Sequence, residues 1–153
     1  MKIILILFFA ILSISQLCGQ NMSNKITTFL MFEGKAEEAM NFYISLFKNS
    51  EIKRITRYKA NEAGAEGTVM HAIFSLNGQD FMCIDSAAKH DFTFTPAISL
   101  HVKCESEEEI DRLFKNLEQD GKVFMPLDFY EFSNKFGWVE DKFGVSWQLN
   151  FEE

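Results

Sequence analysis

The C-terminal stretch of residues 136–151 reads FGWVEDKFGVSWQLNF. Its two aromatic, apolar halves flank Lys142-Phe143-Gly144, a short glycine-containing segment of the kind that joins antiparallel strands. A shorter stretch, FSLNGQDFM at residues 74–82, repeats the pattern around Asn77-Gly78. Each predicted hairpin follows a predicted helix. The chain therefore reads as one structural plan used twice.

The order of predicted elements is the same in both halves of the chain. Apolar and β-branched residues at alternating positions predict strands, whereas apolar residues spaced three and four apart predict helices. In the first half we expect a strand at 25–32, a helix at 35–48, and strands at 51–59, 68–76 and 80–85. In the second half we expect a strand at 97–104, a helix capped by Ser106, a strand at 122–125, a loop at 126–134, and the closing hairpin.

The two predicted helices also match residue by residue at an offset of about 71 positions, which is the signature of an internal repeat. Glu37 and Glu38 fall on Glu108 and Glu109, and apolar positions coincide after them. The sequence therefore predicts an α+β fold of two paired βαβββ modules, which form a curved mixed sheet around a cleft. We place the first module at about 25–85, a linker at 86–95, and the second module at about 96–151.

Length and charge limit the possible functions. A chain of 153 residues with 47% hydrophobic content supports one domain with a substantial core. The formal net charge of -7 disfavours nucleic acid and anionic membrane partners, because these require a basic surface. Cys83 and Cys104 lie on predicted strands in different halves, without metal-binding spacing, and we expect buried free thiols.

The N-terminus carries a separate signal. Lys2 precedes an apolar run, IILILFFAILSI, that is short for a membrane span and typical of a signal peptide, which we place at residues 1–20. Removal of this segment would give an exported protein, periplasmic or extracellular, with no membrane contact. A start at Met22 would instead leave the protein in the cytoplasm. Lipid attachment at Cys18 fits poorly because Leu17 precedes it where a small residue is preferred.

Three strings carry a family resemblance: KITTFLMFEGKAEEAMNFYISLF, GTVMHAIFSLNGQDFMCID and GWVEDKFGVSWQLNF. They resemble the PhnB-like branch of the vicinal oxygen chelate superfamily, which includes glyoxalases, bleomycin-resistance proteins and dioxygenases. The likeness covers a single domain at residues 24–152 and implies paired βαβββ modules in a homodimer. The branch often carries the label of a 3-demethylubiquinone methyltransferase. The sequence has no glycine-rich loop for a nucleotide-like methyl donor, so we do not transfer that activity.

The resemblance also implies positions for a metal site. In metal-using members the ligands come from the first and last strands of each module, which correspond here to Thr28, Met82, Ser99 and Gln148. Two hydroxyls, a thioether and an amide bind divalent cations weakly. A shift of two residues would replace Ser99 by His101. We therefore predict no cofactor and no metal.

The resulting hypothesis is a PhnB-like protein that binds a small molecule in a metal-independent cleft. The predicted ligand-binding residues are Thr28, Leu30, Ser99, His101, Trp138 and Gln148. One alternative is a metal-dependent lyase, isomerase or dioxygenase, for which His101 is the best catalytic candidate because imidazole serves as base or ligand. A second alternative is an exported structural or interaction module without an active site. The sequence leaves open whether the protein is an enzyme.

Overall fold

The computed structural model describes residues 26–153. The predicted signal peptide, Cys18 and the alternative start Met22 lie outside the described residues. Within residues 26–153, no helix has the length and apolar character needed to cross a bilayer.

The element order repeats the βαβββ plan. The first module contains β1 (Thr28–Phe32), α1 (Ala36–Leu46), β2 (Glu51–Arg57), β3 (Val69–Leu76) and β4 (Gln79–Asp85). The second module contains β5 (Leu100–Lys103), α2 (Glu107–Leu117), β6 (Lys122–Tyr130), β7 (Ser133–Glu140) and β8 (Ser146–Phe151). The two predicted hairpins are confirmed as β3–β4 and β7–β8.

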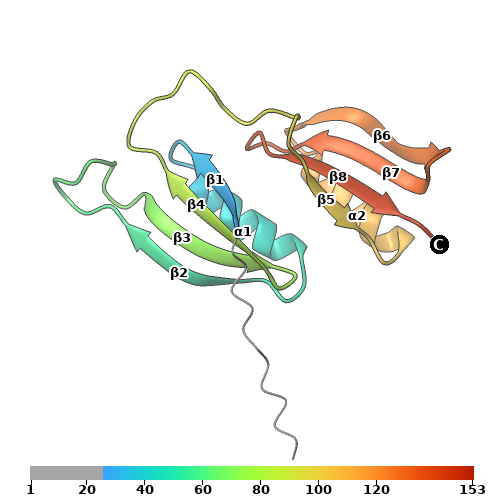
Figure 1. The fold of residues 1–153 in the computed structure, drawn as a ribbon, viewed down its shortest axis with the longest axis horizontal. Helices are drawn as coiled ribbons and strands as arrows, with labels where there is room; N and C mark the ends of the chain where they lie inside the picture. The colour runs from blue at the N-terminus through green and yellow to red at the C-terminus, as the bar shows by residue number, and fades with distance from the viewer. Residues whose placement is uncertain (1–25) are drawn as a thin grey trace, which may run out of the picture.

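The strands form two four-stranded mixed sheets, one for each module. The first sheet has the order β1-β4-β3-β2 and the second sheet has the order β5-β8-β7-β6. In both, the first strand runs parallel to the last one, and the remaining pairs are antiparallel. The matching order supports the duplication and confirms the predicted α+β fold of two βαβββ modules, although the modules form two separate mixed sheets instead of the one curved sheet that we expected. Figure 1 shows the modules side by side, with the linker joining β4 to β5 along the top of this view.

Helix α1 packs on its own sheet and also against the second module. Tyr43 on α1 and Phe47 directly after it lie over Trp147 of β8, with ring centroids 5.2 and 5.8 Å away. From α2, Arg112 donates a hydrogen bond of 2.9 Å to the carbonyl of Leu46 at the end of α1. The buried side chains of both modules therefore form one continuous core.

The start of α2 follows the sequence prediction. Ser106 is the N-cap, and its Oγ accepts a hydrogen bond of 3.2 Å from the backbone N–H of Glu109. The Glu109 carboxylate in turn accepts from the backbone N–H of Glu105 at 2.8 Å. Acidic side chains in the first turn complement the positive end of the helix dipole.

The prediction of a loop at residues 126–134 was wrong. Strand β6 continues through Pro126 to Tyr130, and β7 already begins at Ser133. Proline lacks the N–H that a central strand needs, but β6 is the edge strand of the second sheet and pairs only with β7. Register shifts along β6 show that this pairing is irregular, as expected of an edge strand that accommodates proline.

The strand predicted at 97–104 is shorter than expected. Strand β5 begins only at Leu100, because the chain turns first and the N–H of Ile98 donates to the carbonyl of Thr95 at 3.3 Å. Ile98 is 79% exposed, so it does not share the buried alternation assigned to it. Ser99 consequently lies just before the strand.

Candidate functional site

The second sheet has one face covered by α2 and one face that α2 leaves open. Val139 and Leu149 are fully buried, and Gly137 lies against Phe114 of α2. Successive strand residues point to opposite faces, so the neighbours of these residues point away from the helix. Trp138 and Gln148 are such neighbours, and the β7–β8 register places them side by side.

This open face contains a hollow of about 400 Å³, which we call the open-face hollow. Its lining comes from all four strands and from the residues next to them: His101, Met125, Phe132, Phe136, Trp138, Gln148, Asn150 and Glu152. Three of the predicted ligand-binding residues therefore lie together here.

A hydrogen-bond network lies beneath the hollow and is centred on Ser146, which is 2% exposed. The Ser146 Oγ accepts from Trp138 Nε1 at 2.9 Å and shares a hydrogen bond of 2.7 Å with Ser99 Oγ. Ser99 Oγ also accepts from Gln148 Nε2 at 3.3 Å. This bond orients the Gln148 amide, and it leaves Oε1 of Gln148 as the acceptor available to a ligand.

His101 lies beside this network. The parallel β5–β8 register pairs His101 with Gln148, so the two side chains share the open face. The imidazole is exposed and lines the hollow. It therefore stands where it could exchange a hydrogen bond with a bound molecule.

Thr28 and Leu30 lie elsewhere, at the boundary between the modules. They line a second cavity of about 400 Å³, together with Leu100 and Ser146. Leu30 is only 6% exposed and belongs to the core. The structure thus brings four of the predicted ligand-binding residues together on the open face: Ser99, His101, Trp138 and Gln148. Thr28 and Leu30 line a different cavity, and Ser146 connects the two sites because it lines that cavity and bonds to Ser99 and Trp138. The ligand-binding role of these residues stays a prediction.

Sequence reasoning missed Ser146, although it lies two residues before Gln148 on one strand and so shares its face. Met125 was missed for a different reason. It was placed at the end of a short strand, whereas β6 and β7 form a hairpin that carries it to the hollow, where Phe132 of the connecting turn also lies.

The positions implied for a metal do not fit a divalent cation. Thr28 pairs with Phe81, whereas Met82 pairs with Phe29, so Thr28 and Met82 point to opposite faces of the first sheet. In the second module the donors are a hydroxyl, an amide and one imidazole. Across residues 26–153, no group of three or more histidine, cysteine or acidic side chains is arranged to hold a metal ion.

A buried carboxylate fixes the turn between β7 and β8. Asp141 accepts hydrogen bonds from Tyr43 Oη and Trp147 Nε1, both at 2.8 Å. It also accepts from the backbone N–H groups of Phe143 at 2.8 Å and Val145 at 3.1 Å. Burial raises the pKa of Asp141, and the four donors oppose that rise. This carboxylate anchors the start of β8, and hence Ser146, to helix α1.

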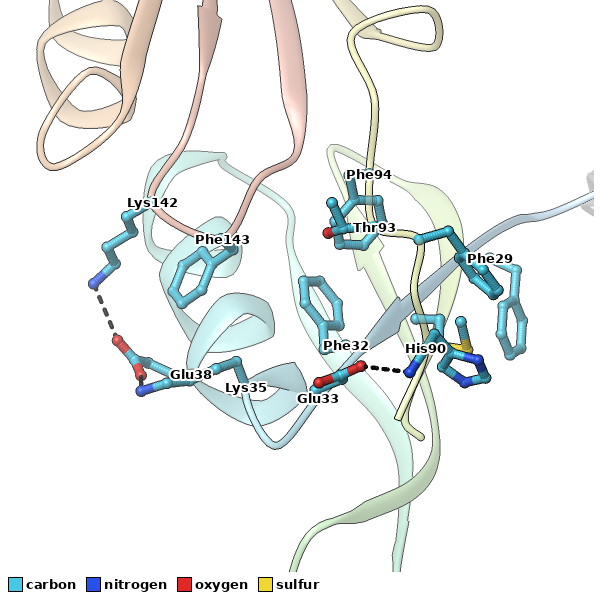
Figure 2. A pocket seen from close by; sticks show the side chains of 12 residues that line it. Phe29, Phe32, Glu33, Lys35, Glu38, His90, Thr93, Phe94, Lys142 and Phe143 are labelled. Atoms are coloured by element: carbon cyan, nitrogen blue, oxygen red, sulfur yellow. Dashed lines mark hydrogen bonds and ion pairs between the residues drawn. The ribbon is translucent and has the colours of Figure 1, made fainter. Parts of the chain in front are cut away.

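A larger hollow of about 650 Å³, which we call the linker pocket, opens between β1, the start of α1, the linker and the β7–β8 turn. Figure 2 shows that Glu38 bridges two cations, Lys35 at 2.8 Å and Lys142 at 3.1 Å. Glu33 accepts from the backbone N–H of His90 at 3.2 Å. The linker pocket therefore differs from the open-face hollow in holding lysines at its rim.

Residues 24–150 match the family described as 3-demethylubiquinone-9 3-methyltransferase. The chain belongs to this family. The matched residues include both modules except for the last residue of β8, and all of the residues that line the open-face hollow except Glu152.

Two relatives support this assignment. The chain is similar to the PhnB protein of Bacillus cereus, with 68% identity, a TM-score of 0.82, and coverage of 83% of this chain and 98% of that protein. It is also similar to protein YjdN of Escherichia coli, with 25% identity over 138 residues, 82% of this chain and 93% of YjdN.

A more distant structure supports the fold alone. The fosfomycin resistance protein FosX of Listeria monocytogenes, solved with Mn(II) and 1S,2S-dihydroxypropylphosphonic acid, has 12% identity and a TM-score of 0.58 over 84% of this chain and 92% of FosX. The family member described here thus shares the glyoxalase-like, vicinal oxygen chelate fold.

Proposed function

We propose that this PhnB-like protein binds a small organic molecule in the open-face hollow without the help of a metal ion. The observation that carries the proposal is the Ser146-centred network, which fixes Gln148 beside His101 on a face walled by aromatic side chains. Small-molecule sites combine such an apolar wall with a few oriented polar groups. Neutral hydroxyl and amide groups suit hydrogen bonding to a ligand better than coordination of a cation.

We further propose that the protein acts as a homodimer in which a second copy covers the hollow. The first sheet also has a face opposite its helix. The register places Phe29 and Ile73 beside Met82, and Met31 beside Ile84, on that face. Phe29 is 51% exposed. An exposed apolar patch of this kind marks an interaction surface, and the aromatic hollow of another copy is its chemical match.

The first test measures ligand-induced melting shifts with a panel of small organic molecules. Gln148→Ala removes the oriented amide, whereas Gln119→Ala removes an exposed glutamine after α2 and serves as the matched control. We expect a ligand that stabilises the parent protein and the Gln119 variant to lose at least about tenfold in affinity in the Gln148 variant. Equal affinity in both variants would contradict the assigned site.

The second test measures the metal content of protein purified without chelators. Metal independence predicts that ligand binding persists after dialysis against a chelator. Stoichiometric metal that is lost in a His101→Ala variant would overturn it, and would support the metal-dependent enzyme.

A further inference from the structure

We infer that the open-face hollow selects a planar aromatic ligand that is neutral or cationic and donates hydrogen bonds, and that it discriminates against organic anions such as phosphonates. This inference names the ligand class for the site and rests on the proposed function. It depends on three properties of the lining: the shape of its apolar wall, the direction of its hydrogen-bonding groups, and its charge.

The wall of the hollow is aromatic and held in place by ring contacts. Phe132 and Phe136 meet edge to face, with centroids 5.2 Å apart and planes at 74°. Trp138 lies 5.0 Å from Phe124, and its ring nitrogen is held by Ser146. Phe132 is 62% exposed at the β6–β7 turn. Such ring faces and edges favour a flat aromatic partner and attract cations over their faces.

Apart from His101, whose ring can donate or accept, the polar groups of the hollow offer acceptors to a ligand. Gln148 uses its nitrogen for Ser99, which leaves its carbonyl oxygen for a ligand. Asn150 is already engaged at both ends, because its oxygen accepts from Ser133 and its nitrogen donates to Glu152 at 3.0 Å. A ligand that donates hydrogen bonds therefore satisfies this site better than one that only accepts them.

The charge of the lining also favours a neutral or cationic ligand over an anion. Among the lining residues in the described part of the chain, 26–153, Glu152 is the only one with a formal charge, and none is a lysine or arginine. An anion would thus enter without a compensating cation and next to a carboxylate. The linker pocket shows the contrast, because Lys35 and Lys142 stand at its rim (Figure 2). In the proposed homodimer, the covering face carries a cation, Arg54 beside Ile73 on the edge strand β2, which opposes this selectivity if it reaches the hollow; a variant of Arg54 is therefore part of the test.

The experiment compares two probes with the same ring system and opposite charge, naphthylmethylamine and naphthoate, with methylphosphonate as a small anion. Binding to the full chain is followed by calorimetry near neutral pH. We expect the amine to bind at least about fivefold more tightly than naphthoate, which corresponds to about 1 kcal/mol, the contribution of one ordinary hydrogen bond. Glu152→Gln should reduce this preference, and Phe132→Ala should weaken binding of the amine. Both side chains are exposed, so these variants should fold.

Three variants locate any anion that binds. Naphthoate that loses affinity in Lys142→Gln occupies the linker pocket, which supports the inference because the anion avoids the hollow. Naphthoate that binds as tightly as the amine, is unaffected by Lys142→Gln and is lost in Gln148→Ala overturns the inference while the proposed function stands. If naphthoate binds the parent protein more tightly than the amine does, and loses that affinity in Arg54→Gln, the inference is also overturned. Failure of both probes to bind overturns the inference alone, since the broader panel still tests the proposed function.

Discussion

The hydrogen bond between Tyr43 and Asp141 joins the two modules, and replacing Tyr43 by Phe tests its contribution. The ring would keep its contacts with Trp147 and Phe143, at 5.2 and 5.9 Å, so the change removes only the hydroxyl. A hydrogen bond to an ionised group contributes about 1.5–3 kcal/mol, and both partners are buried. We expect the free energy of unfolding of Tyr43→Phe to fall by about 2 kcal/mol near neutral pH.

The pH dependence of this loss gives a sharper test. Burial raises the pKa of Asp141 above its ordinary value of 3.8, so the native state binds a proton more readily than the unfolded chain does. The contribution of this group to stability is therefore greatest where the carboxyl is protonated, and it falls as pH rises through the raised pKa. Tyr43 stabilises the ionised form. Its loss should matter most above that pKa and become smaller in acid.

Urea unfolding at neutral and at acidic pH measures both effects. Tyr130→Phe is the matched control, because the Tyr130 hydroxyl donates at 3.0 Å to the carbonyl of Pro126 in an exposed position. The control should change stability by no more than about 0.5 kcal/mol. The reasoning is refuted if the two variants have equal stability at neutral pH, or if the loss in Tyr43→Phe grows as the pH falls.

Three further predictions concern the buried thiols, the contact between Gly137 and Phe114, and the proposed dimer. Burial raises the pKa of Cys83 and of Cys104 to about 12. Alkylation of these thiols in the native protein near neutral pH should therefore be slow and should accelerate on unfolding. Fast alkylation of the native protein would contradict this prediction. Gly137→Ala would place a Cβ 2.5 Å from the Phe114 ring of α2. Thermal unfolding should therefore show a free energy of unfolding that is lower by about 1–3 kcal/mol. Unchanged stability would show that α2 can shift away from β7 without cost. Phe29→Glu should convert the proposed dimer into monomers in light scattering; an unchanged mass would remove Phe29 from the interface.

Much of the fold could be predicted because its signals are local. Asn77 and Gly78 both adopt positive φ angles, 47° and 82°, in the turn that their residue types predict. Ser106 caps α2 through its hydrogen bond to Glu109, and this Ser-x-x-Glu capping pattern is the signal that predicted the start of the helix. The repeat then carried each local assignment from one module to the other.

The site was less accessible to sequence reasoning because it depends on contacts between distant residues. Ser99 and Ser146 are 47 positions apart, and only the pairing of β5 with β8 brings them together. The first part of β6 was predicted, but its continuation beyond Met125 was not, because Pro126 argues against a strand unless its edge position is known. The burial of Leu30, which is only 6% exposed although it lines the cavity between the modules, likewise depends on packing that a single strand pattern does not reveal.

The position of Trp147 has a consequence for how such a duplicated chain can be divided. This indole belongs to one repeat but is covered by Tyr43 and Phe47 of the other, and it is 1% exposed. A chain cut within residues 86–95 would yield a C-terminal fragment with a bare tryptophan and an N-terminal fragment with an uncovered helix. Each fragment would then expose the apolar surface that the other fragment covers, and the two fragments should assemble when they are produced together in the same cell.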